Sequence, residues 1–142
     1  MNELRRRAIG LLARREHSRA ELARKLAAEG TVEEIDTVLA QLEAEGLLSD
    51  ARFAEAYVRS HAERFGGAKL RQTLRARGVD EELFQAPLGA LPDELARARA
   101  VWVKKFGAAP ADRREWARQA RFLQSRGFAP EVVVRLLKEP SE

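Results

Sequence analysis

The chain has 142 residues, 45% of them hydrophobic, and carries 26 Lys and Arg against 22 Asp and Glu, so that its formal net charge is +4. It contains no Cys, which excludes disulfides, thiol catalysis and Cys-based zinc sites. No apolar run approaches the ~20 residues of a membrane span and none at the N-terminus resembles a signal peptide, so we expect a cytoplasmic protein with no membrane partner.

Apolar residues recur at helical spacing in nine places along the chain. In chain order these stripes lie at residues 4–12, 22–26, 35–42, 53–57, 70–74, 83–84, 95–106, 116–123 and 132–137. Ala occurs 25 times and Leu 18 times, whereas Val, Ile and Thr together occur only 14 times. This balance favours helices over a sheet, and the sequence therefore predicts an all-α protein with no sheet.

Capping residues predict where several of these helices begin and end. Ser18, Thr31 and Asp112 each stand three residues before a Glu, which is the spacing of a capping box. Pro92 and Pro130 suit the first position of a helix, and Pro140 is expected to end the last one. Glycines in the left-handed conformation are predicted to end helices at Gly30, Gly46, Gly66–Gly67, Gly78, Gly107 and Gly127, and Pro87 with Gly89 to truncate the sixth helix.

A repeat of about 48 residues underlies this order. Gly30, Gly78 and Gly127 are 48 and 49 residues apart, and a leucine (Leu26, Leu74 or Leu123) precedes each by four residues. An apolar residue follows each glycine by five residues, at Ile35, Leu83 and Val132. Coincidence is the alternative, because helical proteins often contain L-x-x-x-G. The spacing favours three tandem three-helix repeats, at residues 1–47, 48–91 and 92–142.

Basic and acidic blocks alternate along the chain. The net charges are +4 for residues 1–30, −6 for 31–58, +5 for 59–79, −5 for 80–96 and +8 for 97–138. Stacked repeats could separate these charges into a basic side and an acidic side. Alternatively, each acidic helix pairs with a basic neighbour inside the protein.

The sequence gives little support for catalysis. The two histidines are His17, beside a predicted cap, and His61, whose H-x-E context lacks the cysteines of a zinc deaminase. The segment Gly66-Gly67-Ala68-Lys69 lacks the rest of a phosphate-binding loop and is interpreted as a turn. We therefore expect no catalytic residue, no metal, no cofactor and no enzymatic activity.

Basic residues on two helices are the better functional signal. Lys69, Arg71, Arg75 and Arg77 flank the apolar stripe of the fifth helix, and Arg114, Arg118 and Arg121 share the face opposite Trp116 on the eighth. An arginine cluster without interleaved acidic residues gains from an anionic partner. The alternative is an ordinary Arg-rich surface, since Arg outnumbers Lys 21 to 5. The candidate partner-binding residues are Lys69, Arg71, Arg75, Arg77, Arg114, Arg118, Arg121 and Arg126.

Three segments carry a family resemblance. They are LLARREHSRAELARKLAAEG at 11–30, with its R-E-H-S-R-x-E-L core, the segment 36–79 with G-L-L-S-D-x-R-F-A, and ARFLQSRGFAPEVVVRLL at 120–137. In this order and spacing they resemble the RecX family, bacterial regulators of the RecA recombinase. The resemblance covers nearly the whole chain, and residues 84–111 depart from the pattern.

The resemblance implies three tandem three-helix repeats in an elongated, curved stack of helices at right angles. It also implies binding to the RecA–DNA filament and, mainly, negative modulation of ATP hydrolysis, strand exchange and co-protease activity in recombination, DNA repair and the SOS response. Contacts with single- or double-stranded DNA are expected to be weak and non-specific, and the protein to be a monomer.

Two other functions are compatible with parts of the sequence. Residues 18–30 followed by 32–48 read like a helix-turn-helix, which suggests a DNA-binding transcription regulator. A winged helix needs a β-hairpin after it, but residues 46–66 carry Phe53, Ala56 and Tyr57 at helical spacing. The third interpretation is an α-helical scaffold for another protein.

Overall fold

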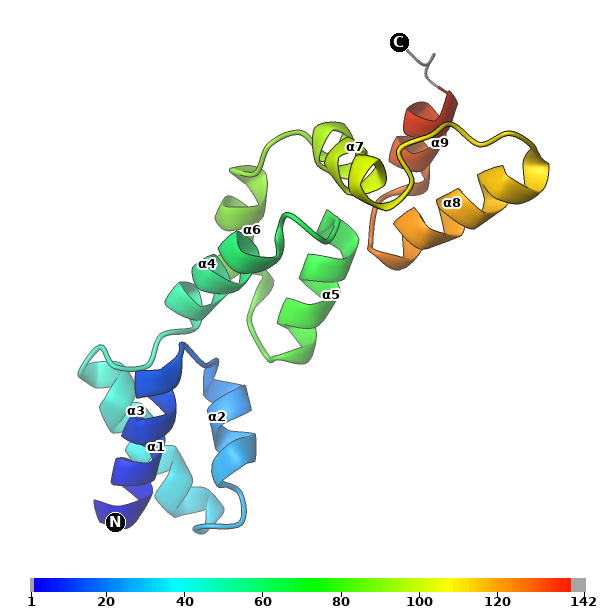
Figure 1. Ribbon diagram of the computed structural model, residues 1–142. Helices are drawn as coiled ribbons and strands as arrows, with labels where there is room; N and C mark the ends of the chain where they lie inside the picture. The colour runs from blue at the N-terminus through cyan, green and yellow to red at the C-terminus, as the bar shows by residue number, and fades with distance from the viewer. Residues whose placement is uncertain (1, 139–142) are drawn as a thin grey trace. The chain divides into compact units, whose positions relative to one another are not determined.

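A computed structural model describes residues 2–138 of the chain (Figure 1). These residues form nine helices and no strand, which confirms the predicted all-α class for the described part of the chain. The helices are α1 (Asn2–Arg14), α2 (Arg19–Leu26), α3 (Val32–Ala44), α4 (Asp50–His61), α5 (Gly67–Ala76), α6 (Glu81–Gly89), α7 (Glu94–Lys105), α8 (Arg113–Ser125) and α9 (Pro130–Lys138). None of these helices is long and apolar enough to cross a membrane.

The predicted helix starts are largely confirmed. Ser18 and Thr31 form complete capping boxes with Glu21 and Glu34, and Asp112 accepts the amide of Glu115 at 2.9 Å. Pro130 is the first residue of α9, as expected. The expectation for Pro92 is wrong, because Asp93 occupies the N-cap and α7 begins at Glu94.

The predicted helix ends are confirmed in part. Gly46, Gly78, Gly107 and Gly127 have positive φ angles, as a left-handed C-terminal residue requires. Gly30 does not, and Gly67 begins α5 instead of ending a helix. Helix α6 ends at Gly89, as expected, but Pro87 lies inside it and does not end it, because a proline near the end of a short helix removes only one amide. Pro140 lies outside the described residues.

The first three helices enclose a core of their own (Figure 1). Leu4, Ala8 and Leu11 of α1 pack on Leu22 and Leu26 of α2. From α3 the core receives Ile35, Val38, Leu39 and Leu42. These positions are the apolar stripes that the sequence predicts, and their burial is the main term that stabilises this repeat.

Helices α7, α8 and α9 enclose a second core (Figure 1). It includes Ala98 of α7, Leu123 of α8 and Val133 of α9, together with Phe128 from the turn between α8 and α9. The buried amide of Gln119 is satisfied, since its oxygen accepts the indole N–H of Trp102 at 2.8 Å. A buried side-chain amide is tolerated only with such partners.

The middle helices are shared between two compact units. The N-terminal unit comprises residues 2–57 and 74–87, and the C-terminal unit comprises residues 58–73 and 88–138. Helix α4 passes from one unit to the other after Tyr57, and α5 after Thr73. The repeat boundaries at 1–47, 48–91 and 92–142 stay a prediction, as does the elongated, curved stack.

The turn after α5 packs closely against the start of α2 within the N-terminal unit. Gly78, with φ of 80°, lies so near Ala20 that an added methyl group would stand 2.6 Å from the Cβ of Ala20. The hydroxyl of Ser18 donates to the carbonyl oxygen of Arg77 at 2.7 Å. A side chain larger than hydrogen cannot occupy Gly78 without displacing α2.

The end of α8 meets the start of α5 in the same way within the C-terminal unit. The amide of Gly66 donates to the carbonyl oxygen of Arg126 at 2.7 Å, and the amide of Ala68 donates to that of Gly127 at 3.2 Å. A methyl group at Gly66 would lie 2.4 Å from the carbonyl oxygen of Gly127. The backbone at the start of α5 therefore donates hydrogen bonds directly to the backbone that follows α8.

Both contacts use equivalent positions of the repeat. Ala20 and Ala68 each precede the repeat leucine, Leu26 or Leu74, by six residues. Leu26, Leu74 and Leu123 are all 0% exposed, which confirms the predicted leucine positions. The second helix of one repeat thus begins against the end of the second helix of the next.

Two residues on one turn of α7 complete the second contact. The carboxylate of Glu94 accepts the amides of Gly67 and Ala129 at 3.1 and 3.0 Å, so it caps the starts of α5 and α9 together. The guanidinium of Arg97 donates to the carbonyl oxygens of Phe65 and Ala62 at 2.6 and 3.3 Å, just beyond α4. Burial lowers the pKa of Arg97, and the charge of Glu94 partly compensates.

The leucine positions lead to the first prediction. Leu74→Ala should lower the free energy of unfolding by about 2–5 kcal/mol, because it leaves a cavity in a fully buried site. Thermal unfolding followed by circular dichroism measures the effect. Unchanged stability would show that the repeat frame is wrong.

The backbone contact at Gly66 leads to the second prediction. Gly66→Ala should destabilise the protein by about 1–3 kcal/mol, since the new methyl group overlaps the backbone of Gly127. Gly10→Ala is the matched control, because nothing lies within 4 Å of its added carbon and Gly10 is inside α1. It should stabilise the protein by about 0.5–1 kcal/mol. Urea denaturation of the two variants tests the contrast, and equal effects would contradict the assigned contact.

Candidate interaction surface

Charge divides unevenly between the two units. The C-terminal unit, as far as it is described, contains fifteen Lys and Arg against six Asp and Glu, a net charge of +9. The described N-terminal unit contains eleven against fourteen, a net charge of −3. The excess of unbalanced positive charge therefore belongs to residues 58–73 and 88–138.

Arginines of the first repeat are largely paired inside it. Arg5 of α1 contacts Glu45 at 2.6 Å, and Arg19 of α2 contacts Asp36 and Glu43 of α3 at 2.8 and 3.2 Å. The intramolecular interpretation of the charge alternation is thus correct for this repeat. Exposed pairs of this kind stabilise a protein by only about 0.2–1 kcal/mol each, but they leave fewer cations for a partner.

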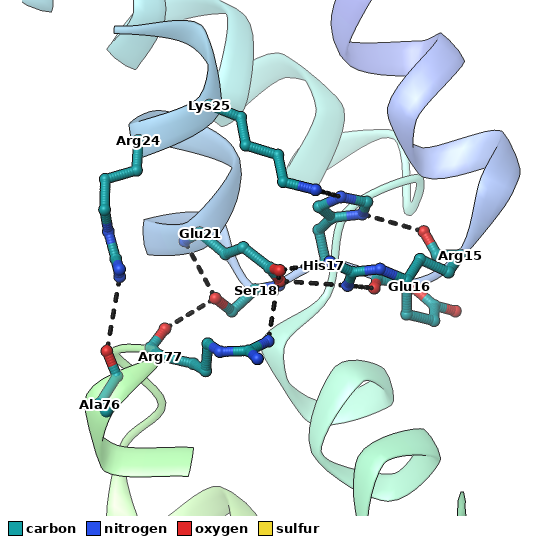
Figure 2. Close-up of polar contacts among 9 residues, drawn as sticks. All are labelled: Arg15, Glu16, His17, Ser18, Glu21, Arg24, Lys25, Ala76 and Arg77. Carbon is teal, nitrogen blue, oxygen red and sulfur yellow. Dashed lines mark hydrogen bonds and ion pairs between the residues drawn. The ribbon is translucent and has the colours of Figure 1, made fainter. Parts of the chain in front are cut away.

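The R-E-H-S-R-x-E-L segment is a structural connection. Figure 2 shows Glu21 between the guanidinium groups of Arg15 and Arg77, with Ser18 beside them. Arg15 pairs with Glu21, which is six residues later in the chain. Arg77, just beyond the end of α5, contacts the same carboxylate at a distance of 3.3 Å. Burial raises the pKa of Glu21, but the hydrogen bond and charge of Arg15 outweigh it, so the pKa lies below its ordinary value. The network joins the first repeat to the second.

His17 is buried in this network as a neutral imidazole. Its side chain is 1% exposed, and its Nδ1 lies 3.1 Å from the carbonyl oxygen of Arg15 (Figure 2). The ammonium of Lys25 donates to its Nε2 at 3.0 Å, so Nδ1 carries the proton. Burial lowers the pKa of His17, and the backbone of Arg15 only partly opposes this. His17 thus directly precedes the N-cap Ser18, as the sequence predicts, and its ring packs within the protein.

The predicted residues near α5 are mostly engaged within the protein. Arg75 pairs with Glu81 at 2.6 Å, and Arg77 lies beyond the helix and pairs with Glu21. Arg71 is half-buried and has an interaction of its own. The ammonium of Lys69 lies 6.0 Å from the centre of the Phe65 ring. Placing Arg77 on the fifth helix was wrong, because α5 ends at Ala76.

The predicted face of α8 is exposed, as expected. Arg114 and Arg121 are exposed and have no acidic partner among residues 2–138. Arg118, in contrast, pairs with Glu115 at 2.9 Å and lies over the ring of Phe106. The assumption that no acidic residue interleaves with this cluster was wrong, because residues three apart on a helix are neighbours.

A basic cleft in the C-terminal unit contains residues that the sequence analysis missed. It has a volume of about 360 Å³ and is lined by Arg64, Lys104, Lys105 and Arg126. Phe122 and Val101 form apolar parts of its wall. Of the predicted residues only Arg126 belongs to it.

Aromatic rings contact three of the four cations of the basic cleft. The guanidinium of Arg126 lies 4.7 Å from the centre of Phe122 and 5.6 Å from that of Phe65. Lys105 lies 5.1 Å from Phe122, and Arg64 lies 5.4 Å from Phe65. Such cation–π contacts are worth about 0.5–1 kcal/mol at exposed sites and restrict where the cations can move.

The sequence held one usable signal for this cleft. Lys104-Lys105 and Arg64-Phe65 place cations next to each other or to an aromatic residue, as nucleic-acid-binding surfaces do. What the sequence could not supply is that α4, α7 and α8 converge. Within the described residues no group of three or more His, Asp and Glu could hold a metal ion.

Three family models match the chain in order. Residues 5–42, 49–86 and 92–137 match the first, second and third three-helix domains of RecX. The chain is 52% identical over 134 residues to the regulatory protein RecX of Leptothrix cholodnii, covering 93% of this chain and 85% of the relative. It is 46% identical over 137 residues to that of Ralstonia nicotianae, covering 95% and 86%.

Solved structures share the fold. A crystal structure of a regulatory protein RecX superposes with a TM-score of 0.83 at 21% identity, covering 97% of this chain and 73% of that one. A crystal structure of RecX from Lactobacillus salivarius gives a TM-score of 0.75 at 18% identity, covering 96% and 94%. At these identities the likeness concerns the three-helix architecture.

The buried imidazole of His17 leads to the third prediction. Its folded-state pKa is below the ordinary 6.5, so the unfolded chain takes up a proton first as the pH falls. The stability that neutral His17 provides is complete above about pH 6.5 and is lost as the pH falls below it. The paired carboxylate of Glu21 acts separately, at pH values below its ordinary 4.5.

Urea denaturation between about pH 8 and pH 5 measures this loss. The variant His17→Gln should show a flatter pH dependence than the parent, since it cannot take up the proton. His61→Gln, which removes the other histidine, is the matched control. A parental pH dependence in His17→Gln would contradict the assignment.

Proposed function

This chain belongs to the RecX family of regulatory proteins, and on that premise we propose that it binds the filament of the RecA recombinase on DNA. Its effect is mainly negative: it lowers ATP hydrolysis, strand exchange and co-protease activity of the filament. It acts in this way in recombination, DNA repair and the SOS response. The protein works as a monomeric regulator and not as an enzyme.

One observation in particular supports this function. Arg114 and Arg121 of α8 are exposed and have no carboxylate partner within residues 2–138. The planar guanidinium donates paired hydrogen bonds to phosphate and carboxylate alike, and a nucleoprotein filament presents both. The full set of contact residues that we propose is Lys69, Arg71, Arg75, Arg77, Arg114, Arg118, Arg121 and Arg126.

Their contributions differ according to their partners in the free protein. Arg114, Arg121 and Arg126 form no ion pair within the described residues, so they can bind an anion without breaking one. Arg75 and Arg77 must first release Glu81 and Glu21. We therefore assign the larger part of the contact to the third repeat.

A helix-turn-helix transcription regulator has less support. A winged-helix protein needs a β-hairpin after its recognition helix. Here α4 occupies that place, and the described residues contain no strand. Binding to naked DNA with a clear sequence preference would favour the regulator, and absence of binding to DNA and filament would favour a scaffold.

The fourth prediction tests the contact through the variant Arg114→Glu/Arg121→Glu. It should need a roughly tenfold or higher concentration for half-inhibition of the DNA-dependent ATPase of RecA, because both cations become repulsive. Arg118 is left in place to preserve its pair with Glu115. Helical content should stay at the parental level, since both residues are exposed.

The control is Arg114→Lys/Arg121→Lys, which keeps the charge and loses the planar fork. It should retain most of the inhibition, and inhibition by the parent should weaken as the salt concentration rises. Parental inhibition by the folded Glu variant would refute the assignment of these arginines. Absence of inhibition by the parent protein itself would refute the proposed function.

A further inference from the structure

We propose that the basic cleft of the C-terminal unit binds the phosphodiester backbone of single-stranded DNA. Its key residues are Arg64, Lys104, Lys105, Arg126 and Phe122. The inference rests on the proposed function in one respect, because a filament regulator meets DNA and recombinase together. The DNA contact itself requires no RecA and is tested without it.

The cations of the cleft are not balanced within the protein. Arg64, Lys104, Lys105 and Arg126 form no ion pair with any acidic residue among residues 2–138. Glu63 is the one acidic residue among the described lining residues. Four converging cations repel one another, and an anionic ligand in the cleft removes that repulsion.

Arg126 is already held in a binding geometry. Its guanidinium lies against Phe122 and Phe65, and its Nη1 is 3.5 Å from the carbonyl oxygen of Arg64. The aromatic rings accept no conventional hydrogen bond from the guanidinium, so N–H groups of Arg126 stay available to an anion. Because the cation is ordered before the ligand arrives, less entropy is lost on binding.

The lining favours a nucleic acid strand over an acidic protein segment. A strand carries one charge per nucleotide, so successive phosphates can meet several of the four cations at once. The wall also includes the half-buried ring of Phe122 and the side chain of Val101, which offer an apolar surface to a sugar or base. A carboxylate side chain makes no use of that surface. An unstacked single strand, unlike a duplex, exposes its bases for such contacts.

The experiment measures fluorescence anisotropy of labelled oligo-dT with the full chain and no RecA, over a series of salt concentrations. The test variant is Lys104→Glu/Lys105→Glu, whose residues are exposed and outside the buried core. Affinity should fall at least about tenfold, and the salt slope should fall by about 1.4, since each lost phosphate contact on a single strand accounts for ~0.7.

Two further variants serve as controls. Arg135→Glu/Lys138→Glu makes the same change in charge on α9, where both residues are exposed and neither lines the cleft. Its affinity should stay within about threefold of the parent, because only long-range attraction is reduced. Lys104→Arg/Lys105→Arg keeps the charges in the cleft and should bind as the parent does. Circular dichroism verifies that all variants are folded.

Three results would overturn the inference: an equal loss of affinity in both Glu variants, parental binding by the cleft variant, or tighter binding of a labelled poly-glutamate peptide than of oligo-dT. The RecA ATPase assay separates this inference from the proposed function. If the parent protein inhibits the RecA ATPase and the cleft variant still binds DNA like the parent, only the cleft assignment is refuted. Cleft-dependent DNA binding without any effect on RecA refutes only the proposed function.

Discussion

Close packing of a glycine turn against the start of a helix in the preceding repeat is the constraint on which the rest of the fold depends. The turn around Gly78 lies against Ala20, and the turn around Gly127 lies against Gly66 and Ala68. Gly66, Gly78 and Gly127 have no room for a side chain there, because an added Cβ would lie 2.3–2.6 Å from the nearest atom opposite. The remaining polar groups of the contacts are satisfied by side chains, namely Ser18 in the first and Glu94 with Arg97 in the second. The middle repeat has a contact of this kind at each end of α5, which explains why its helices are shared between two compact units.

The same division separates structural charges from charges that can serve binding. In the N-terminal unit, arginines such as Arg5, Arg19 and Arg77 have carboxylate partners that position helices. In the C-terminal unit, Arg114, Arg121 and the cations of the basic cleft have none within the described residues. A count of basic residues therefore overestimates the number of cations that the first repeat can offer to a partner, and it underestimates the share of the third repeat. Whether a carboxylate lies within reach matters more than the local net charge.

Much of the fold could be predicted from local sequence signals. Capping at Ser18 and Thr31 and the burial of Leu26, Leu74 and Leu123 depend on residues a few positions apart, so spacing alone reveals them. The resemblance to a family added the repeat count and the expected partner.

Other features depend on residues that are distant in sequence. Gly66 was interpreted as a turn residue, but its role is set by the backbone of Gly127, 61 positions away. The basic cleft escaped prediction for the same reason, because Arg64 lies in the turn between α4 and α5 whereas Lys104 lies on α7. The pair between Arg118 and Glu115, in contrast, follows from their spacing of three residues on one helix.

The uneven charge of the two units also bears on how the protein finds a partner. Over distances greater than contact, a polyanion attracts the C-terminal unit, with its +9, and repels the N-terminal unit, with its −3. Within about one Debye length, roughly 8 Å at physiological ionic strength, the field of the C-terminal unit attracts such a molecule before any side chain touches it. Encounters with a polyanion then begin at the C-terminal unit, and association is faster than a random search of the surface allows.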